Sequence, residues 1–286
     1  MKKDADPFGV GFLFEMSEMV FEIERLVQVL LNVREKKPVV HAMTNWVTAN
    51  EVASCLYAIG ARAIMAIASE EAEEITAKAD ALVLNLGTPS SRRIEAMLRS
   101  GHRANRDGHP ILFDPVGVSA SKFRTESARR ILSDLNITVI RGNGSEIGAL
   151  AGREGHMAGV DAAPSGSEDG DQPAQDLCKK TGAIVIASGP EDLIVSSMSQ
   201  VRVGNGHPMM SQVPGMGCML TAVIGAFNAV EKDPMIASVS GVAFFGLAGE
   251  RAALMTKGPG TFKSAFLDAL YSLTIDQMRK GIKIRS

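Results

Sequence analysis

The stretch "ALVLNLGTPSSRRIEAMLRSGHRANRDGHPILFD", residues 81–114, predicts a strand, a helix and a second strand in succession. The runs at 81–86 and 110–114 are short and apolar, which is typical of buried strands, and the longer segment 91–107 has a helical pattern. Two strands joined by a crossover helix lie parallel in one sheet. The stretch therefore predicts an α/β fold.

The same alternation extends in both directions along the chain. Further strands are predicted at 38–43, 62–67, 137–141 and 183–188, and further helices at 48–59, 70–79, 124–134, 144–151 and 172–181. Two close runs indicate an antiparallel hairpin at one sheet edge, at 193–196 and 200–204. Three helices are predicted after residue 214, at 217–231, 235–256 and 261–280. We expect a three-layer αβα fold with a mainly parallel central sheet and helices on both faces.

The length fits one large α/β domain or two smaller ones, and the composition is ordinary for a globular protein. The chain has 286 residues, a net charge of −2 and 45% hydrophobic residues, so no broad basic field would attract nucleic acid or an anionic membrane. No uninterrupted apolar run is long enough to span a bilayer. We expect residues 1–15 to be an extension before a helix at 16–35, and residues 16–286 to form one domain with a polar surface loop at 163–173.

The three cysteines, Cys55, Cys178 and Cys218, are far apart and have no C-x-x-C spacing, which argues against a zinc site. Their odd number suits a reducing compartment, so we expect a cytoplasmic protein. Cys55 and Cys178 are interpreted as small buried hydrophobic residues.

Polar residues or glycines follow most of the predicted strands. Examples are Asn45, Gly87, Asp114, Arg141 and Ser188, each at or just after the end of a different apolar run. Ligands in open α/β sheets bind beyond the carboxyl ends of the strands. We therefore expect these residues to share one site.

Three charged residues at these ends suit a phosphate and its metal ion. Asp114 and Glu146 offer the hard oxygen ligands that magnesium prefers, and Arg141 offers a fork for phosphate. Each has a simpler interpretation: Asp114 as a turn residue before proline, Glu146 as a carboxylate favoured at a helix start, and Arg141 as a surface ion-pair partner.

The stretch "QVPGMGCMLTAVIGAF", residues 212–227, places Gly215, Gly217 and Cys218 at the start of a helix. The glycines either allow tight packing or let an anion approach the N–H groups of residues 215–218. The stretch lacks the third glycine of the dinucleotide fingerprint and the G-K-[ST] of a P-loop.

Five segments together resemble the hydroxyethylthiazole kinase family of the ribokinase-like superfamily. They are "VVHAMTNWVTANEVASCLYAIGARAIM", "ADALVLNLGT", "FDPVGVSASKFRTESARRIL", "IRGNGSEIGALAG" and "VPGMGCMLTAVIGAF". The resemblance runs from about residue 36 to about residue 275, in order and with compatible spacing, and it weakens across 153–176.

The resemblance implies an enzyme that phosphorylates the primary hydroxyl of 4-methyl-5-(2-hydroxyethyl)thiazole with ATP and magnesium, a salvage step toward thiamine. It also implies a homotrimer with active sites between subunits. By the same resemblance, ATP binds at Arg141 and Ser188, the thiazole at Met65, Gly215 and the Asn45 segment, and magnesium with phosphate at Asn143 and Glu146.

Cys218 stands where the family has its proposed catalytic cysteine and where most of the wider superfamily has aspartate. The first helical turn is expected to lower the pKa of this thiol. Because a thiolate is a poor match for an alcohol proton, we expect Cys218 to contribute modestly and the N–H groups near Gly215 and Gly217 to stabilise the moving phosphoryl group.

The sequence departs from the family at Pro214, Met216 and Pro190. We expect Pro214 to stiffen the glycine loop, because proline fixes φ and removes an N–H, and Met216 to crowd the phosphate channel. Two alternatives remain: another small-alcohol kinase, such as a pyridoxal or hydroxymethylpyrimidine kinase, and a non-catalytic binder of thiazole or nucleotide. Cys218 argues against the first. Met65 has the alternative of being core filler.

Overall fold

The computed structural model describes residues 10–153 and 171–285. The beginning of the predicted extension, residues 1–9, and most of the predicted loop at 163–173 lie outside the described residues. No helix in the described part combines the length and the hydrophobicity that a membrane span needs.

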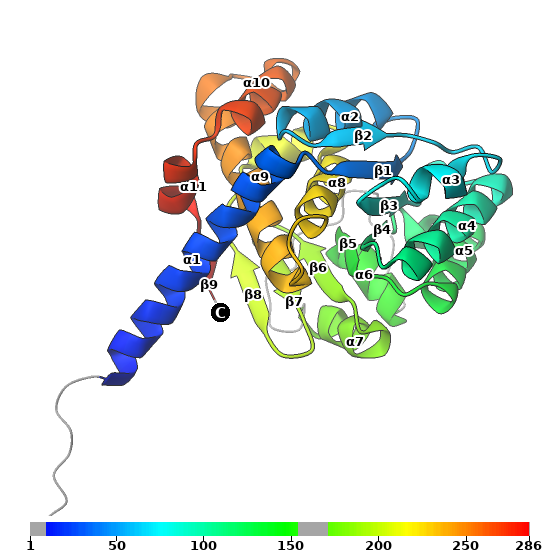
Figure 1. Cartoon of the computed structure of the whole chain (residues 1–286), viewed down its shortest axis with the longest axis horizontal. Coiled ribbons are helices and arrows are strands. Elements are labelled where there is room, and N and C mark those ends of the chain that lie inside the picture. The colour runs from blue at the N-terminus through cyan, green and yellow to red at the C-terminus, as the bar shows by residue number, and fades with distance from the viewer. Residues whose placement is uncertain (1–9, 154–170, 286) are drawn as a thin grey trace, which may run out of the picture.

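In the described residues a nine-stranded sheet forms the middle layer, in the order β2-β1-β3-β4-β5-β6-β7-β8-β9 (Figure 1). The strands are β1 (Val39–Met43), β2 (Arg62–Ile64), β3 (Ala81–Asn85), β4 (Ile111–Asp114), β5 (Val139–Asn143), β6 (Ile184–Ser188), β7 (Asp192–Val195), β8 (Gln200–Val203) and β9 (Ile284–Arg285). β1 to β6 pair in parallel, and β7, β8 and β9 continue the sheet in antiparallel fashion. The predicted parallel sheet with a hairpin at one edge is confirmed.

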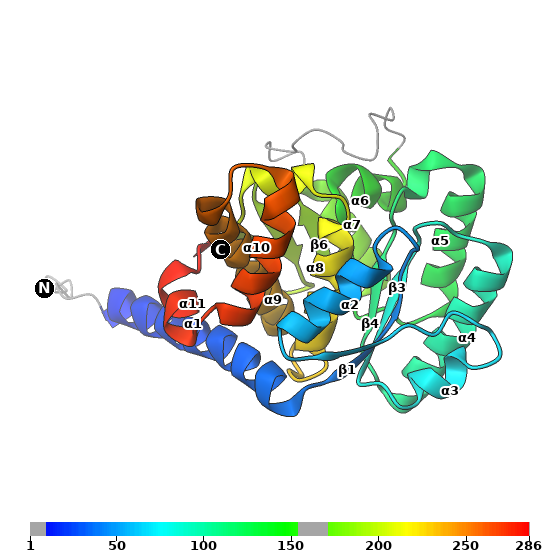
Figure 2. The ribbon, with the colours of Figure 1, turned by 90° about the horizontal axis from the view of Figure 1, so that it is seen from above.

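Helices cover both faces of the sheet, as Figure 2 shows from above. One layer contains α3 (Ala72–Thr76), α4 (Ser91–Asp107), α5 (Lys122–Asp134), α6 (Gly144–Ala151) and α7 (Gln172–Thr181). The other contains α1 (Val10–Lys36), α2 (Ala49–Ala58), α8 (Met216–Asn228), α9 (Pro234–Met255), α10 (Pro259–Ser272) and α11 (Ile275–Gly281). The expected three-layer αβα architecture is therefore correct.

Several helices differ from their predicted bounds by one to three residues at an end, and two predictions differ by more. The predicted helix 261–280 is two helices, because Leu273 is extended and Thr274 starts α11 with a capping box closed by Gln277. The T-x-x-Q pattern that encodes this box lies inside an apolar periodicity that continues across it. Helix α1 begins at Val10, before the expected start at residue 16.

Helix α8 determines where the site lies, because it is buried along nearly all of its length. It packs on β1, β3 and β4, and at Gly225 a Cβ would lie only 3.0 Å from Val83 Cγ2 of β3. This contact seats the helix directly on the sheet. Its N-terminus consequently lies over the carboxyl ends of β3 and β4.

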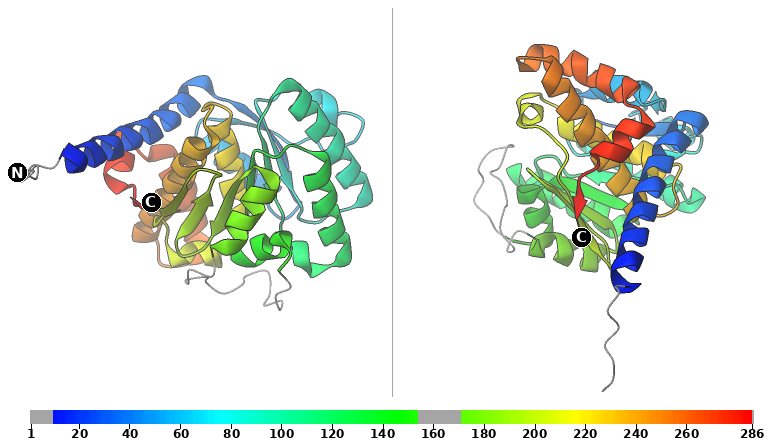
Figure 3. Two further views of the ribbon diagram at one scale, coloured as in Figure 1. Left: turned by 90° about the horizontal axis from the view of Figure 1, so that it is seen from below. Right: turned by 90° about the vertical axis from the view of Figure 1, so that its left-hand side faces the viewer.

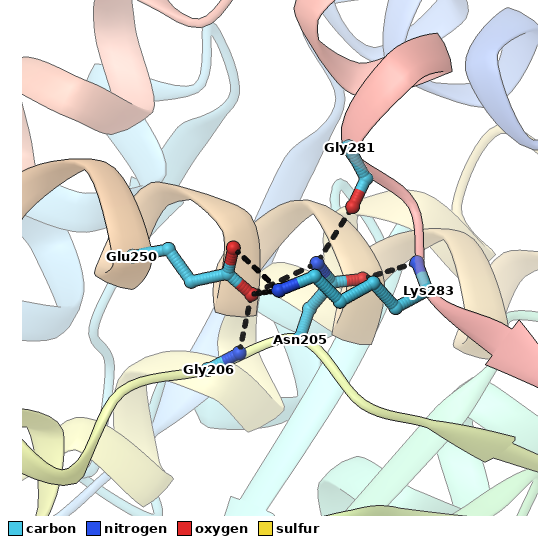
Figure 4. A network of polar contacts seen from close by, with 5 residues as sticks. All are labelled: Asn205, Gly206, Glu250, Gly281 and Lys283. Carbon is cyan, nitrogen blue, oxygen red and sulfur yellow. Dashed lines mark hydrogen bonds and ion pairs between the residues drawn. The ribbon is translucent and has the colours of Figure 1, made fainter.

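The connection from β8 to α8 starts in a polar network with the C-terminal segment (Figure 4). Glu250 Oε1 accepts from Asn205 Nδ2 and from Gly206 N, both at 3.0 Å, and Lys283 Nζ bonds both Glu250 oxygens at 3.0 Å. Asn205 also bonds Gly281 O and Lys283 N. The network holds the start of this connection against α9 and against the segment that continues as β9 (Figure 3).

Candidate functional site

The candidate residues gather at the carboxyl edge of the sheet, where α8 begins. Asn85 and Asp114 end β3 and β4 and are direct partners in the parallel register. Asn143 and Ser188 end β5 and β6 and are partners in the same way. Asn45 follows the end of β1. The predicted convergence of strand ends on one site is therefore present in the structure.

Both glycines of the loop before α8 permit close approaches. Gly215 is the N-cap and has φ of +88°, and a Cβ there would lie 2.6 Å from Thr48 Cγ2. A Cβ at Gly217 would overlap Arg141 Nη1. Both glycines thus allow tight packing, and the group packed on Gly217 is a guanidinium, which is itself a phosphate-binding group.

The first turn of α8 presents backbone N–H groups beside that guanidinium. The first hydrogen bond across the cap runs from Met219 N to Gly215 O at 2.9 Å, and a helix has no carbonyl for the N–H groups before that one. Arg141 Nε donates to Ser188 Oγ at 2.9 Å, which orients the guanidinium. Two predicted ATP-binding side chains and the helix start therefore form one positively polarised surface.

Met216, the first residue of α8, is 8% exposed and belongs to the same core cluster as Cys218. The expectation that Met216 crowds a phosphate channel stays a prediction. Pro214 is exposed in the loop before the N-cap.

The Cys218 thiol lies in a group of side-chain amides. Its Sγ accepts from Asn45 Nδ2 at 3.4 Å and from Asn85 Nδ2 at 3.3 Å. Burial, together with the charge of Asp114, raises the pKa of this thiol to about 11, against the opposing effect of hydrogen bonds from Thr48 and Asn45. The expectation of a lowered pKa is wrong, because burial and the charge of Asp114 outweigh these hydrogen bonds and the charge of Arg141. Cys218 is a neutral thiol at pH 7.

Asp114 is buried and has one oxygen available. Its Oδ2 accepts from Asn85 Nδ2 at 2.8 Å and from Thr221 Oγ1 at 3.1 Å, whereas Oδ1 is buried with no hydrogen-bond partner among the described residues. Burial raises the pKa of Asp114 to about 6; Arg141 opposes this rise and Glu146 adds to it. A buried carboxylate oxygen without a partner is a suitable ligand for a hard cation.

Glu146 is held by backbone N–H groups on both oxygens. Oε1 accepts from Gly117 N and Oε2 from Asn143 N, both at 2.9 Å, and Asn143 Oδ1 accepts from Glu146 N. Asn143 and Glu146 thus form a capping box at the start of α6. The simpler interpretation of Glu146, as a carboxylate favoured at a helix start, describes its observed contacts. These bonds fix its distance from any bound ion.

In the described ranges, 10–153 and 171–285, no three His, Cys, Asp or Glu side chains gather in a group that could hold a metal ion. A magnesium ion at this edge would therefore need oxygens from water and from a phosphate in addition to the protein. Magnesium commonly binds in this way, through one or two carboxylates and the substrate's phosphates. The residues present fit that coordination.

Met65 lies just beyond β2, not within the strand. It is half-buried and packs against the core cluster that also includes Cys218. None of the described hydrogen bonds or ion pairs joins it to the rest of the site. Met65 follows the end of β2, and Asn45 follows the end of the neighbouring parallel strand β1.

Three residues of the site were not found from the sequence: Asn85, Thr221 and Thr48. Asn85 is the polar residue inside the otherwise apolar run "ALVLNL", which was a detectable signal. Thr221 follows Cys218 by about one helical turn, so both face the strand ends. Thr48 contacts Gly215 only through folding.

The chain is similar to known proteins over most of its length. The model of the "Hydroxyethylthiazole kinase family" matches residues 30–276. A hydroxyethylthiazole kinase of Thermoanaerobacter pseudethanolicus is 46% identical over 259 residues, 90% of this chain and 98% of that protein. One from Methanocella arvoryzae is 45% identical over 257 residues, 90% of this chain and 96% of that protein.

The chain is also similar to solved structures. A hydroxyethylthiazole kinase from Pyrococcus horikoshii OT3 superimposes with a TM-score of 0.84 at 37% identity, covering 91% of this chain and 98% of the other. A pyridoxal kinase from Staphylococcus aureus, solved with ADP, has a TM-score of 0.54 at 18% identity, covering 75% and 88%. The second likeness shows a shared fold alone.

Proposed function

Because this chain belongs to the hydroxyethylthiazole kinase family, we propose that it transfers the γ-phosphoryl group of ATP to the primary hydroxyl of 4-methyl-5-(2-hydroxyethyl)thiazole. The reaction would salvage the thiazole for thiamine. The observation that carries the proposal is the meeting of Arg141, the first turn of α8 and the free oxygen of Asp114 at one sheet edge. A phosphoryl donor, a metal ion and an acceptor can be aligned there.

Binding of the triphosphate is assigned to the positive groups of the site. The N–H groups of Met216, Gly217 and Cys218 and the guanidinium of Arg141 would contact phosphate oxygens and stabilise the charge on the transferring group. Ser188 keeps Arg141 in place through its 2.9 Å hydrogen bond. Phosphoryl transfer depends mainly on such alignment and charge stabilisation.

Asp114, Glu146 and Asn143 would hold the magnesium ion. Asp114 Oδ1 is the group suited to the ion or to its bound water, and Glu146 would act through water because both of its oxygens already accept backbone N–H bonds. When bound, the ion neutralises the charge of the phosphate oxygens. Asn143 fixes Glu146 through the capping box.

The acceptor alcohol is assigned to the side of the site formed by Asn45, Met65, Gly215 and Cys218. Asn45 and Cys218 are joined by a hydrogen bond, and Gly215 contacts the helix that follows Asn45 through Thr48. With a pKa of about 11, the Cys218 thiol is not a strong base at neutral pH. Its role is to orient the hydroxyl group, and alignment supplies most of the rate.

We also propose a homotrimer that works in the cytoplasm, with each site close to a neighbouring subunit. Next to Asn45, the side chains of Trp46 and Val47 are 73% and 67% exposed, and Tyr57 on α2 is 62% exposed. Large apolar side chains exposed at the surface suit a subunit contact. Analytical ultracentrifugation tests it: a species of three chains is expected, and a monomer would contradict the proposal.

A coupled assay of ADP release over a set of small alcohols tests the reaction. We expect magnesium-dependent turnover with the hydroxyethyl thiazole and none with 5-ethyl-4-methylthiazole, which has no hydroxyl group. Turnover of pyridoxal but not of the thiazole would indicate a different alcohol kinase. Calorimetric binding of the thiazole without turnover would indicate a non-catalytic binder. Either result would refute the proposed function.

A further inference from the structure

Asn85 lies at the centre of the site, and its side chain uses its full hydrogen-bonding capacity. Nδ2 donates to Asp114 Oδ2 at 2.8 Å and to Cys218 Sγ at 3.3 Å. Oδ1 accepts from Gly87 N at 3.0 Å and from Asn45 Nδ2 at 2.9 Å. A primary amide has two N–H donors and two acceptor positions, so all four are occupied. The residue is 1% exposed, so it is shielded from bulk solvent.

These four contacts permit only one orientation of the amide. If the oxygen and nitrogen were exchanged, the oxygen would face the Asp114 carboxylate, and the NH₂ group would face the two donors on Gly87 and Asn45. Asn45 is constrained in the same way, because its Nδ2 donates to Asn85 and Cys218 while its Oδ1 accepts from Val47 N at 3.0 Å. Through the backbone N–H groups of Gly87 and Val47, the two amides therefore hold the Cys218 thiol and the Asp114 carboxylate in fixed positions.

This arrangement decides which oxygen of Asp114 is available. Asn85 and Thr221 hold Oδ2, so Oδ1 is the oxygen left without a partner among the described residues. Among the described hydrogen bonds, Asn85 is the side chain that bonds both Asp114 and Cys218. We propose that Asn85 is a positioning residue for phosphoryl transfer, which sets the carboxylate and the thiol at fixed places relative to each other. The inference rests on the proposed function and assigns no contact with substrate to Asn85.

Two substitutions at Asn85 and one control test this role. Asn85→Leu removes every polar contact at similar size, and Asn85→Asp keeps the shape and an acceptor while replacing the donor that faces Asp114. We expect kcat to fall about 100-fold in each, with less than about a threefold change in KM for ATP, since a displacement of about 1 Å costs this much. Wild-type kcat in a folded Asn85→Asp protein would overturn the proposal.

The matched control is Asn228→Leu. Asn228 is a buried amide at the other end of α8, where its Nδ2 donates to Ile224 O at 2.9 Å. Its loss should lower the melting temperature while changing kcat less than about threefold. If Asn228→Leu lowers kcat as much as the Asn85 variants, the effect is general destabilisation and the positioning role is wrong.

A double-mutant cycle with Asp114→Asn separates positioning from a merely structural role. If Asn85 acts through Asp114, then Asn85→Leu should cost less than about 10-fold in kcat in the Asp114→Asn background, instead of about 100-fold. A loss of 10-fold or more in that background would mean independent effects and would overturn the inference.

Crystal structures separate this inference from the proposed function. In a folded Asn85→Asp protein we expect Asp114 Oδ2 or Cys218 Sγ to move by about 1 Å or more, as the positioning argument requires. Unmoved atoms would refute the role of Asn85 whether or not the enzyme phosphorylates the thiazole. Absence of turnover in the wild-type protein would refute the proposed function alone.

Discussion

Replacing Gly217 by alanine gives the sharpest test of the proposed phosphate-binding surface, which Arg141, Ser188 and the first turn of α8 form. A Cβ at this position would overlap Arg141 Nη1 and would lie 3.2 Å from both Cζ and Nη2. Carbon and nitrogen atoms pack at about 3.5–4.0 Å, so the guanidinium must withdraw by about 1 Å. Backbone atoms are not involved in the overlap, and the fold can accommodate the change.

The expected cost is in catalysis and not in stability. A displacement of about 1 Å in a group that aligns the triphosphate is worth about 100-fold in kcat/KM for ATP, or about 2.7 kcal/mol. Alanine is a better helix former than glycine by up to about 1 kcal/mol, so the melting temperature should not fall. In Gly217→Ala, kcat/KM for ATP should therefore fall while the melting temperature does not.

Coupled ADP release at varied ATP and thermal unfolding measure these effects. Gly260→Ala is the control, because Gly260 occupies the second position of α10, as Gly217 does of α8, and a Cβ there meets nothing within 4 Å. We expect the control to keep wild-type activity. If Gly217→Ala also kept wild-type kcat/KM for ATP, the assignment of Arg141 and this helix turn to the triphosphate would be refuted.

Three further predictions follow from the site and its surroundings. Cys218→Ser and Cys218→Asp should retain turnover in the ADP-release assay, and a loss beyond about 10⁴-fold in Cys218→Ser would show general-base catalysis by the thiol. The folded state binds the Asp114 proton more tightly than the unfolded chain, because burial raises its pKa from 3.8 to about 6. The metal-free protein should therefore lose up to about 3 kcal/mol of stability as pH rises from about 4 to about 6, and urea unfolding should show no such loss in Asp114→Asn. Glu250→Gln should lower the free energy of unfolding in urea by less than about 1 kcal/mol, because the ion pair of Glu250 with Lys283 is partly exposed. Glu250→Leu should cost about 2 kcal/mol more, because Asn205 Nδ2 and Gly206 N lose their acceptor. Equal losses in the two variants would contradict this account.

The sequence predicted the sheet well because most of its parallel strands, all but the edge strand β2, are largely buried. Such strands are nearly continuous apolar runs, and each predicted strand overlaps an observed one. The break between α10 and α11 was missed, since the apolar spacing continues across Leu273 and Thr274 while a local capping box ends the helix. The short β9 has two residues and no periodicity to detect.

The candidate site was predictable as a location and less so as a set of contacts. Strand ends must meet at one edge, so Asp114, Arg141 and Ser188 could be grouped from their positions alone. The pKa of Cys218 depends on what surrounds its side chain after folding. Asn85 was overlooked because its partners Asn45, Asp114 and Cys218 are distant in sequence, so their contacts exist only in the folded chain.

The network around Glu250 has a consequence for the order of events during synthesis. Lys283 and Gly281 hold Asn205, and Asn205 begins the connection that ends at Gly215. The ribosome makes Gly281 and Lys283 long after it has made the glycine loop, and these residues must still leave the exit tunnel. A nascent chain can therefore pair β1 to β8 before Gly281 and Lys283 anchor the start of the connection from β8 to α8. Deleting the residues from Gly281 onward should leave β1 to β8 paired and loosen the start of that connection.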